Sequence, residues 1–310
     1  MALELQRNHE SMTVPREILP GRSYMITRRC TQRQFLLRPD PEVNNTILYC
    51  LAEAAQRFDI DIVLPSVLAN HHHLVVYDRH GTVIEFVEHF HKFVAKAVNA
   101  LRGRRENLWS VEPVSLVHLI DAEDVVDKLV YSATNPVKDG LVETVGDWPG
   151  INGLSQLLGG QTITVERPRH FFRKNGPMPK SVDLRLVIPP ELGDADAIRA
   201  QVRERVAHME TELARARKRA GTKVMGRRAV LRQDWRARPH TEEPRRGLSP
   251  RIAARNKWSR IESLRRNREF VALYQRARVL WRAGIEVLFP AGTYWLRRFA
   301  NVPVARVASV

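Results

Sequence analysis

The stretch LANHHHLVVYD, residues 68–78, places three adjacent histidines between two apolar runs. Side chains alternate across a strand, so His71 and His73 share one face of it and His72 points to the other. The Cα atoms of residues i and i+2 lie about 6.7 Å apart in a strand, which lets both imidazoles reach one cation. Two ordinary hydrogen-bonded histidines would give the same pattern, so the remainder of a metal site has to come from elsewhere in the chain.

The apolar periodicity around this stretch predicts the element order β-α-β-β-α-β followed by a third helix. The strands are expected at 23–31, 59–70, 71–78 and 114–120, and the helices at 41–58, 82–101 and from Asp121 to about Val137. This order is typical of a ferredoxin-like α+β fold, an antiparallel sheet with two helices on one face.

The third predicted helix carries a second polar pair. Tyr131 and Asn135 are four residues apart and therefore share one face of that helix. Pro136 disfavours helical backbone at the residue before it, so the helix is expected to end at Asn135. Taken alone, a tyrosine beside an amide at a helix end is typical of an ordinary surface pair.

The positive charge is concentrated in the second half of the chain. Residues 161–310 hold 34 Lys and Arg against 14 Asp and Glu, a net of +20, whereas residues 1–160 hold 16 against 20, a net of −4. This asymmetry predicts a basic extension that binds DNA and is attached to a separate domain. The element order and the turn-rich stretch at 146–160 place the first domain at 17–155 and the mainly helical extension at 156–310. A solvated arginine-rich surface would give the same composition. Residues 232–256 are rich in Arg, Pro and Gly and are expected to form a mobile link.

Tryptophans are frequent in the basic half, at Trp235, Trp258, Trp281 and Trp295. Such rings can stack on unpaired bases, but at helical spacing we favour a place in the core. No apolar run approaches the roughly 20 residues of a membrane span, and the first residues contain no apolar segment of a secretory signal. Cys30 and Cys50 form no disulfide framework or metal-type spacing, which favours a reducing cytoplasm.

The combination of motifs is more specific than any one of them. LANHHHLVV at 68–76, FHKFVAKAVN at 90–99, YSATNPVKDGLV at 131–142 and DWPGING at 147–153 follow one another in that order. Together they resemble the single-tyrosine HUH transposases with an IS200-like domain, in particular the REP-associated tyrosine transposases, over roughly residues 17–150. That family usually has an aliphatic residue between its two histidines, where this chain has His72.

The resemblance implies a metal-dependent transposase that cuts and rejoins single-stranded DNA, with hairpin-flanked sites as its target. Tyr131 would be the nucleophile that forms a 5′-phosphotyrosine link. His71, His73 and Asn135 would bind a divalent ion, magnesium or manganese; two nitrogens and one oxygen suit manganese better by ligand softness. Lys92, Arg28 and Arg29 are candidates for DNA contacts, although solvated basic residues are common. A protein of this kind would work in the cytoplasm, held at the nucleoid through DNA. Relatives occur as monomers and as dimers that exchange the catalytic helix, so a homodimer stays open.

Two other functions fit the same residues. A non-catalytic or domesticated nucleic-acid-binding protein could keep the sheet and the basic extension without covalent chemistry. A metal-dependent nuclease could use His71 and His73 to bind metal, with water rather than Tyr131 as its nucleophile. Covalent capture of DNA separates the first from a transposase, and cleavage that survives removal of Tyr131 identifies the second.

Overall fold

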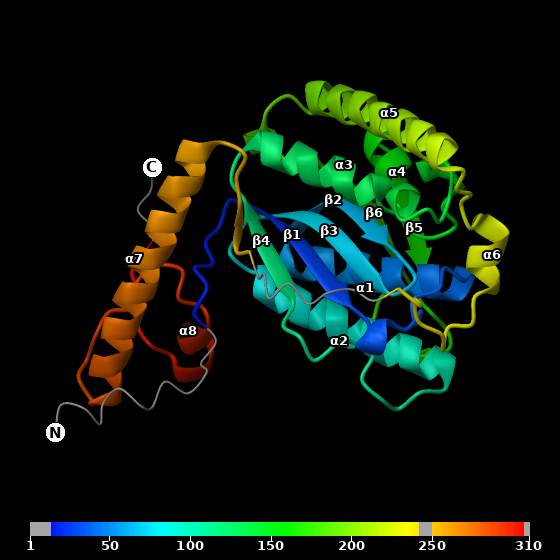
Figure 1. The fold of residues 1–310 in the computed structure, drawn as a ribbon. Coiled ribbons are helices and arrows are strands. Elements are labelled where there is room, and N and C mark those ends of the chain that lie inside the picture. Colours follow the sequence, from blue (N-terminus) through cyan, green and yellow to red (C-terminus); the bar gives the residue numbers. More distant parts are fainter. Residues whose placement is uncertain (1–13, 242–249, 307–310) are drawn as a thin grey trace. The chain divides into compact units, whose positions relative to one another are not determined.

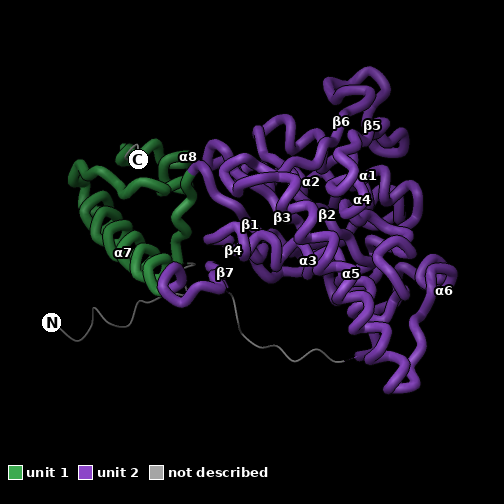
Figure 2. The backbone as a smooth tube through the Cα atoms, turned by 90° about the horizontal axis from the view of Figure 1, so that it is seen from above, with its two compact units in different colours: residues 1–19, 261–310 green, residues 20–260 purple. Residues whose placement is uncertain are grey.

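The computed structural model describes residues 14–241 and 250–306 of the 310-residue chain. These residues form two compact units, and Figure 2 colours them separately. Unit 2 comprises residues 20–260, and unit 1 comprises residues 1–19 and 261–310. In the described residues, no helix is long and apolar enough to span a membrane.

Unit 2 is built on a mixed sheet with the strand order β2-β3-β1-β4-β7. Its elements run β1 Arg22–Arg29, α1 Pro41–Phe58, β2 Ile60–Val67, β3 His71–Asp78, α2 Val83–Arg102, β4 Ser115–Leu119 and, much later in the chain, β7 Ile252–Ala253. The first four strands pair antiparallel, and β7 adds a short parallel edge beside β4. The predicted α+β fold with its β-α-β-β-α-β order is confirmed, while the β7 edge was not predicted.

Helices cover both faces of this sheet (Figure 1). Helices α1 and α2 pack side by side on one face, and α3, Ala122–Lys138, lies on the other face beneath α5, Ala195–Ala220. The alternation of β3 explains the division of its side chains. His72 contacts Phe90 and His91 of α2, whereas His73 lies against Tyr131 of α3.

Helix α3 runs past its proline, close to the predicted end near Val137 but beyond Asn135, where the preference of Pro136 placed the end. Pro136 is inside the helix, which reaches Lys138. Proline removes only one donor, and near the C-terminus the other backbone groups of the last turn keep partners: Asp139 N donates to the Asn135 carbonyl at 2.9 Å and Leu141 N to the Pro136 carbonyl at 3.0 Å. Asn135 is therefore a helical residue with a buried side chain, one full turn after Tyr131.

The later elements of unit 2 pack on this framework. They are α4 Leu154–Gly159, β5 Thr162–Glu166, β6 Ser181–Arg185 and α6 Arg227–Arg232, with short 3-10 turns at Thr31–Arg33, Val145–Asp147 and Pro190–Leu192. The β5–β6 hairpin lies against α1, where Asn45 Nδ2 donates to the Glu166 carbonyl at 3.0 Å and Tyr49 Oη to the Pro179 carbonyl at 2.6 Å. Residues beyond 155 thus form part of the same compact unit as the sheet.

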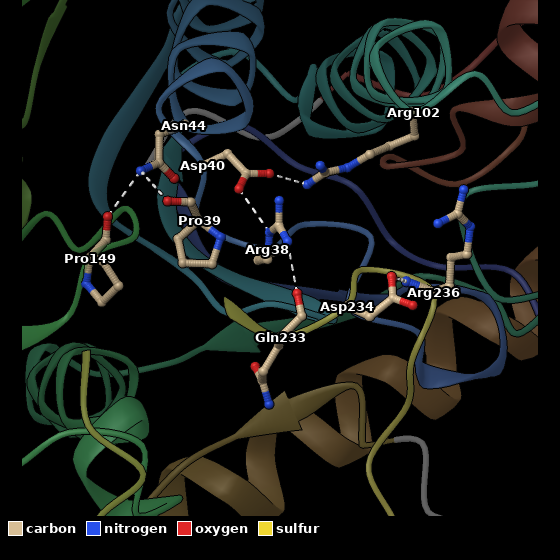
Figure 3. Close-up of polar contacts among 9 residues, drawn as sticks. All are labelled: Arg38, Pro39, Asp40, Asn44, Arg102, Pro149, Gln233, Asp234 and Arg236. Carbon is tan, nitrogen blue, oxygen red and sulfur yellow. Dashed lines mark hydrogen bonds and ion pairs between the residues drawn. The ribbon is translucent and has the colours of Figure 1, made fainter. Parts of the chain in front are cut away.

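Residues 233–241 were expected to belong to a mobile link, but they are held against the loop that follows β1. Phe35 N donates to the Ala237 carbonyl at 3.0 Å, and Arg38 Nη1 donates to the Gln233 carbonyl at 2.8 Å. Figure 3 shows that Arg38 also bonds Asp40, which in turn pairs with Arg102 of α2. The rest of the expected link includes β7, and residues 242–249 lie outside the described residues.

Unit 1 is small and mainly helical. It contains most of α7, Lys257–Arg282, and α8, Trp295–Ala300. Its core consists of Ala277, Phe289 and Val302, with Tyr274, Val287, Leu296 and Val304 packed around them. The N-terminal segment joins it through the amide of Ile18, which donates to the Gly292 carbonyl at 3.1 Å. Gly292 has φ +88°, and a Cβ there would lie 2.7 Å from Glu17 Cγ, so glycine is required at this contact.

Candidate active site

Four of the predicted site residues meet between β3 and α3. His71 Nε2 lies 3.2 Å from Asn135 Oδ1, and the ring centroids of His71 and His73 are 4.9 Å apart. The ring centroid of Tyr131 lies 5.4 Å from that of His73. The strand supplies two imidazoles on one face, and the helix supplies a phenol and an amide one turn apart. All four come from one chain.

A contact at Nδ1 fixes the orientation of each of the two histidine rings. Asn70 Nδ2 donates to the Arg33 carbonyl at 3.3 Å, so Asn70 Oδ1 faces His71 Nδ1 and accepts a hydrogen bond from it at 2.7 Å. When the His71 ring is neutral with its proton on Nδ1, Nε2 carries the lone pair and faces Asn135 Oδ1 at 3.2 Å. His73, the next residue on the same face of β3, has a similar contact: its Nδ1 lies 2.8 Å from Thr27 Oγ1 of β1. Each ring is thus held through Nδ1 and presents Nε2 to the site.

The donor set fits a divalent cation. His73 Nε2 is buried without a hydrogen-bond partner, and His71 Nε2 faces the amide oxygen of Asn135. A cation between these atoms would satisfy all three, and histidines that bind metals usually donate a hydrogen bond from the far ring nitrogen, as these two rings can. Among the described residues there is no group of three or more His, Cys, Asp and Glu side chains suited to a metal. The set here has two histidines, with Asn135 as its third donor.

Burial keeps His73 in the form that binds cations. Burial, and after it the adjacent imidazoles of His71 and His72, lowers the pKa of His73 well below its ordinary value, while the Asn135 side chain opposes this with a smaller effect. A ring that stays neutral at physiological pH has a lone pair available, as a metal ligand requires.

Tyr131 lies at the open side of the site. Its side chain is 37% exposed, whereas His73 and Asn135 are each 5% exposed. Two ammonium groups flank the phenol ring: Lys128 Nζ is 5.8 Å and Lys138 Nζ 5.2 Å from its centroid. Sequence reasoning missed both lysines. Their positions three residues before and seven residues after Tyr131 place all three on one helix face, which was the available signal.

The three basic candidates lie in different places. Arg29 pairs with His71 in the β1–β3 register and is exposed. It lines a cavity of about 840 Å³ together with Arg33, Arg238 and His240, the last two from the segment at 233–241. Arg28 points to the opposite face, where Nη1 lies 3.2 Å from His91 Nδ1. Lys92 is exposed on α2, which covers that opposite face, and is not brought to Tyr131.

His72 has its own partner behind the strand. His91 Nδ1 accepts from Arg28, so His91 Nε2 donates to His72 Nε2 at 2.8 Å. Trp109 Nε1 donates to the His91 carbonyl at 2.9 Å and closes this buried cluster. Burial lowers the pKa of His72 to about 3. The polar residue between the two site histidines is therefore a neutral core residue on the α2 side.

No family model matches this chain, and no curated protein matches it. A solved structure described as "Structure of the REP associates tyrosine transposase bound to a REP hairpin" is similar at 18% sequence identity. The match covers 52% of this chain and 88% of that chain, with a TM-score of 0.40.

Proposed function

We propose that unit 2 is a metal-dependent transposase that cleaves and rejoins single-stranded DNA, with Tyr131 as its nucleophile. One observation carries the proposal: the partly exposed phenol of Tyr131 lies against the His73 ring, and the adjacent His71 ring directs its Nε2 at the buried amide of Asn135. A nucleophile next to residues that can hold a cation suits phosphoryl transfer through a covalent intermediate.

His71, His73 and Asn135 would hold the divalent ion, and magnesium and manganese are the candidates. When bound, the ion polarises the scissile phosphate and stabilises the negative charge that develops on it. Asn70 and Thr27 orient the two imidazoles through their Nδ1 atoms. The burial of His73 excludes water from its side of the site.

Tyr131 performs the bond exchange. A free phenol has a pKa of about 10, so it is a weak nucleophile until it loses its proton. Its oxygen forms a bond to phosphorus, the bond from phosphorus to the 3′-oxygen breaks, and that oxygen leaves as a 3′-hydroxyl with a proton from the medium. The 5′-phosphate stays on Tyr131. Attack by a 3′-hydroxyl from another strand reverses the step, and joining needs no external energy source.

The surroundings favour a nucleic acid strand over a small phosphate ester. Lys128 and Lys138 flank the phenol, and Arg29 opens into the cavity that Arg33, Arg238 and His240 also line. Basic side chains at successive positions fit a chain of phosphates better than a single one. The motif resemblance to REP-associated tyrosine transposases adds hairpin-flanked ends as the proposed target. Because β3 and α3 of one chain supply all four groups, we propose that a monomer holds a complete site.

Cleavage of labelled single strands tests this function. The intact protein is incubated with end-labelled oligonucleotides, with and without hairpins, in manganese or magnesium, and the products are separated on a denaturing gel. We expect metal-dependent cleavage that disappears in Tyr131→Phe and in His71→Ala. Cleavage that persists in Tyr131→Phe would identify a water-using nuclease, and binding without cleavage of any strand, including those flanking the gene, would identify a binding protein.

A further inference from the structure

Helix α8 of unit 1 presents an aromatic face that the fold of this unit does not use. Trp295, Arg298 and Phe299 occupy positions i, i+3 and i+4 and share one side of the helix. The ring centroids of Trp295 and Phe299 are 4.3 Å apart, and Arg298 Cζ lies 5.0 Å from the Phe299 centroid. Leu296, on another side of the helix, packs against the core of Ala277, Phe289 and Val302.

The two rings remain largely in water. Trp295 is 51% and Phe299 57% exposed. Large apolar side chains that stay exposed next to each other mark an interaction surface more often than isolated ones do. The expectation that the tryptophans of the basic half lie in the core does not hold for Trp295, nor for Trp258 and Trp281, which are 75% and 38% exposed. Trp235 is half-buried, with the guanidinium of Arg236 4.3 Å from its ring centroid.

The positive charge of unit 1 indicates which class of partner this face binds. Residues 261–306 contain nine arginines and three glutamates, a net charge of +6, and Arg297 and Arg298 lie in α8 itself. A second copy of this chain would bring the same positive charge against this face. A single-stranded nucleic acid offers negative phosphates to this basic unit and flat bases to the exposed rings.

We propose that the face formed by Trp295, Arg298 and Phe299 binds single-stranded nucleic acid by base stacking, as a contact site separate from the one at Tyr131. The bases stack on the two rings, and the guanidinium groups contact the backbone. Stacking is tolerant of sequence, so this site would hold a strand without selecting it. The proposal needs no chemistry at Tyr131 and holds whether or not unit 2 cleaves DNA.

Binding to two strands of equal charge tests the proposal. The full chain carries Tyr131→Phe and is kept in EDTA, so that neither cleavage nor a metal contributes. Fluorescence anisotropy then measures the dissociation constants of a labelled oligothymidine and of an abasic strand with the same number of phosphates. We expect Trp295→Ala with Phe299→Ala to weaken oligothymidine binding about tenfold or more, with little change for the abasic strand.

Matched variants complete the design. Val279→Ala, at a 69% exposed aliphatic position on α7, should leave both dissociation constants unchanged. Trp295→Phe keeps a ring and should retain most of the binding, and it gives a second comparison should the double variant lose helix content in circular dichroism. Arg298→Gln should weaken both strands alike.

Three results would overturn the proposal. In one, the double variant binds oligothymidine as tightly as its parent. In another, the affinity for the abasic strand falls as much as that for oligothymidine. In the third, sedimentation shows a dimer that the double variant alone dissociates, which would make this face a self-association surface. None of these results would change the outcome of the cleavage assay with Tyr131→Phe, so either proposal can be refuted without refuting the other.

Discussion

Asn70→Ala tests how the protein prepares His71 to bind a cation. The substitution removes two side-chain hydrogen bonds, the one from His71 Nδ1 at 2.7 Å and the one to the Arg33 carbonyl at 3.3 Å. The backbone carbonyl of residue 70, which accepts from Cys30 N at 2.8 Å, is kept. The loop therefore keeps its main attachment while the His71 ring loses the partner that sets its tautomer and rotation.

The size of the effect follows from these contacts. Partners on the far nitrogen of a histidine ligand typically change metal affinity 10- to 100-fold. His73 and Asn135 keep their positions in this variant, so we expect the lower part of that range, about 10- to 30-fold, or roughly 1.4–2 kcal/mol. The lost hydrogen bonds should lower the free energy of unfolding by only about 1 kcal/mol, since each contributes little net stability.

Calorimetric titration of the intact chain with manganese measures the affinity directly. Asn45→Ala is the matched control, because it also removes an amide bond to a backbone carbonyl, at 3.0 Å, but on the α1 side of the sheet. The reasoning would be refuted if manganese affinity changed less than twofold in Asn70→Ala, or if it fell equally in Asn45→Ala.

Three further predictions concern separate parts of unit 2. Thr27→Val keeps the side-chain shape but removes the oxygen 2.8 Å from His73 Nδ1, and calorimetry should show manganese affinity about tenfold lower. Lys138→Ala removes a cation 5.2 Å from the Tyr131 centroid, and anisotropy should show weaker single-strand binding with a smaller salt dependence. Glu53→Gln should cost roughly 2 kcal/mol in urea unfolding at pH 7, because Glu53 is buried and accepts from His89 at 2.6 Å and Arg57 at 2.7 Å.

The contribution of Glu53 to the free energy of unfolding depends on pH. Burial alone raises the pKa of Glu53, but the hydrogen bonds from His89 and Arg57 together outweigh it and leave the pKa lowered. A lowered pKa stabilises the fold above the ordinary glutamate value of about 4.3, and this contribution is lost as the pH falls through the folded pKa. The difference between Glu53→Gln and wild type should therefore shrink at pH 3, and an equal difference at pH 3 and pH 7 would contradict the explanation.

Controls for the other two variants lie on α1 and α2, which cover the opposite face of the sheet from α3. Thr46→Val on α1 also removes a hydroxyl bond, at 2.6 Å to the Glu42 carbonyl, and should leave manganese affinity unchanged. Lys92→Ala removes an exposed lysine from the opposite face of the sheet and should alter binding less than Lys138→Ala does. Equal effects of the two lysine variants would mean that general charge, and not the position beside Tyr131, governs binding.

The sequence predicted the elements of the sheet closely because their periodicity is local. Helix α1 spans Pro41–Phe58 as expected, and α2 and β3 agree with expectation to within a residue at each end. The i to i+2 and i to i+4 spacings also placed His71 with His73 and Tyr131 with Asn135. That the two pairs meet depends on how α3 crosses β3, and only the resemblance to a family indicated it in advance.

Local sequence patterns could not predict the contacts between segments that are far apart in the chain. The short β7 and the attachment of 233–241 to the loop after β1 join residues about 130 to 200 positions apart in the chain. The composition of that region, rich in arginine and proline, is typical of a link. The end of α3 was mistaken because the rule for Pro136 describes an average preference, whereas the last helical turn can lose one donor without unwinding.

The most direct test of the central claim is to identify the residue that becomes joined to the DNA. The wild-type protein is incubated with a cleavable single strand and manganese, digested with nuclease and trypsin, and analysed by mass spectrometry. We predict a residual nucleotide on the peptide of residues 129–138, which contains Tyr131 between the cleavage sites at Lys128 and Lys138. Cleaved DNA with this peptide unmodified, or with the nucleotide on another residue, would contradict the role assigned to Tyr131.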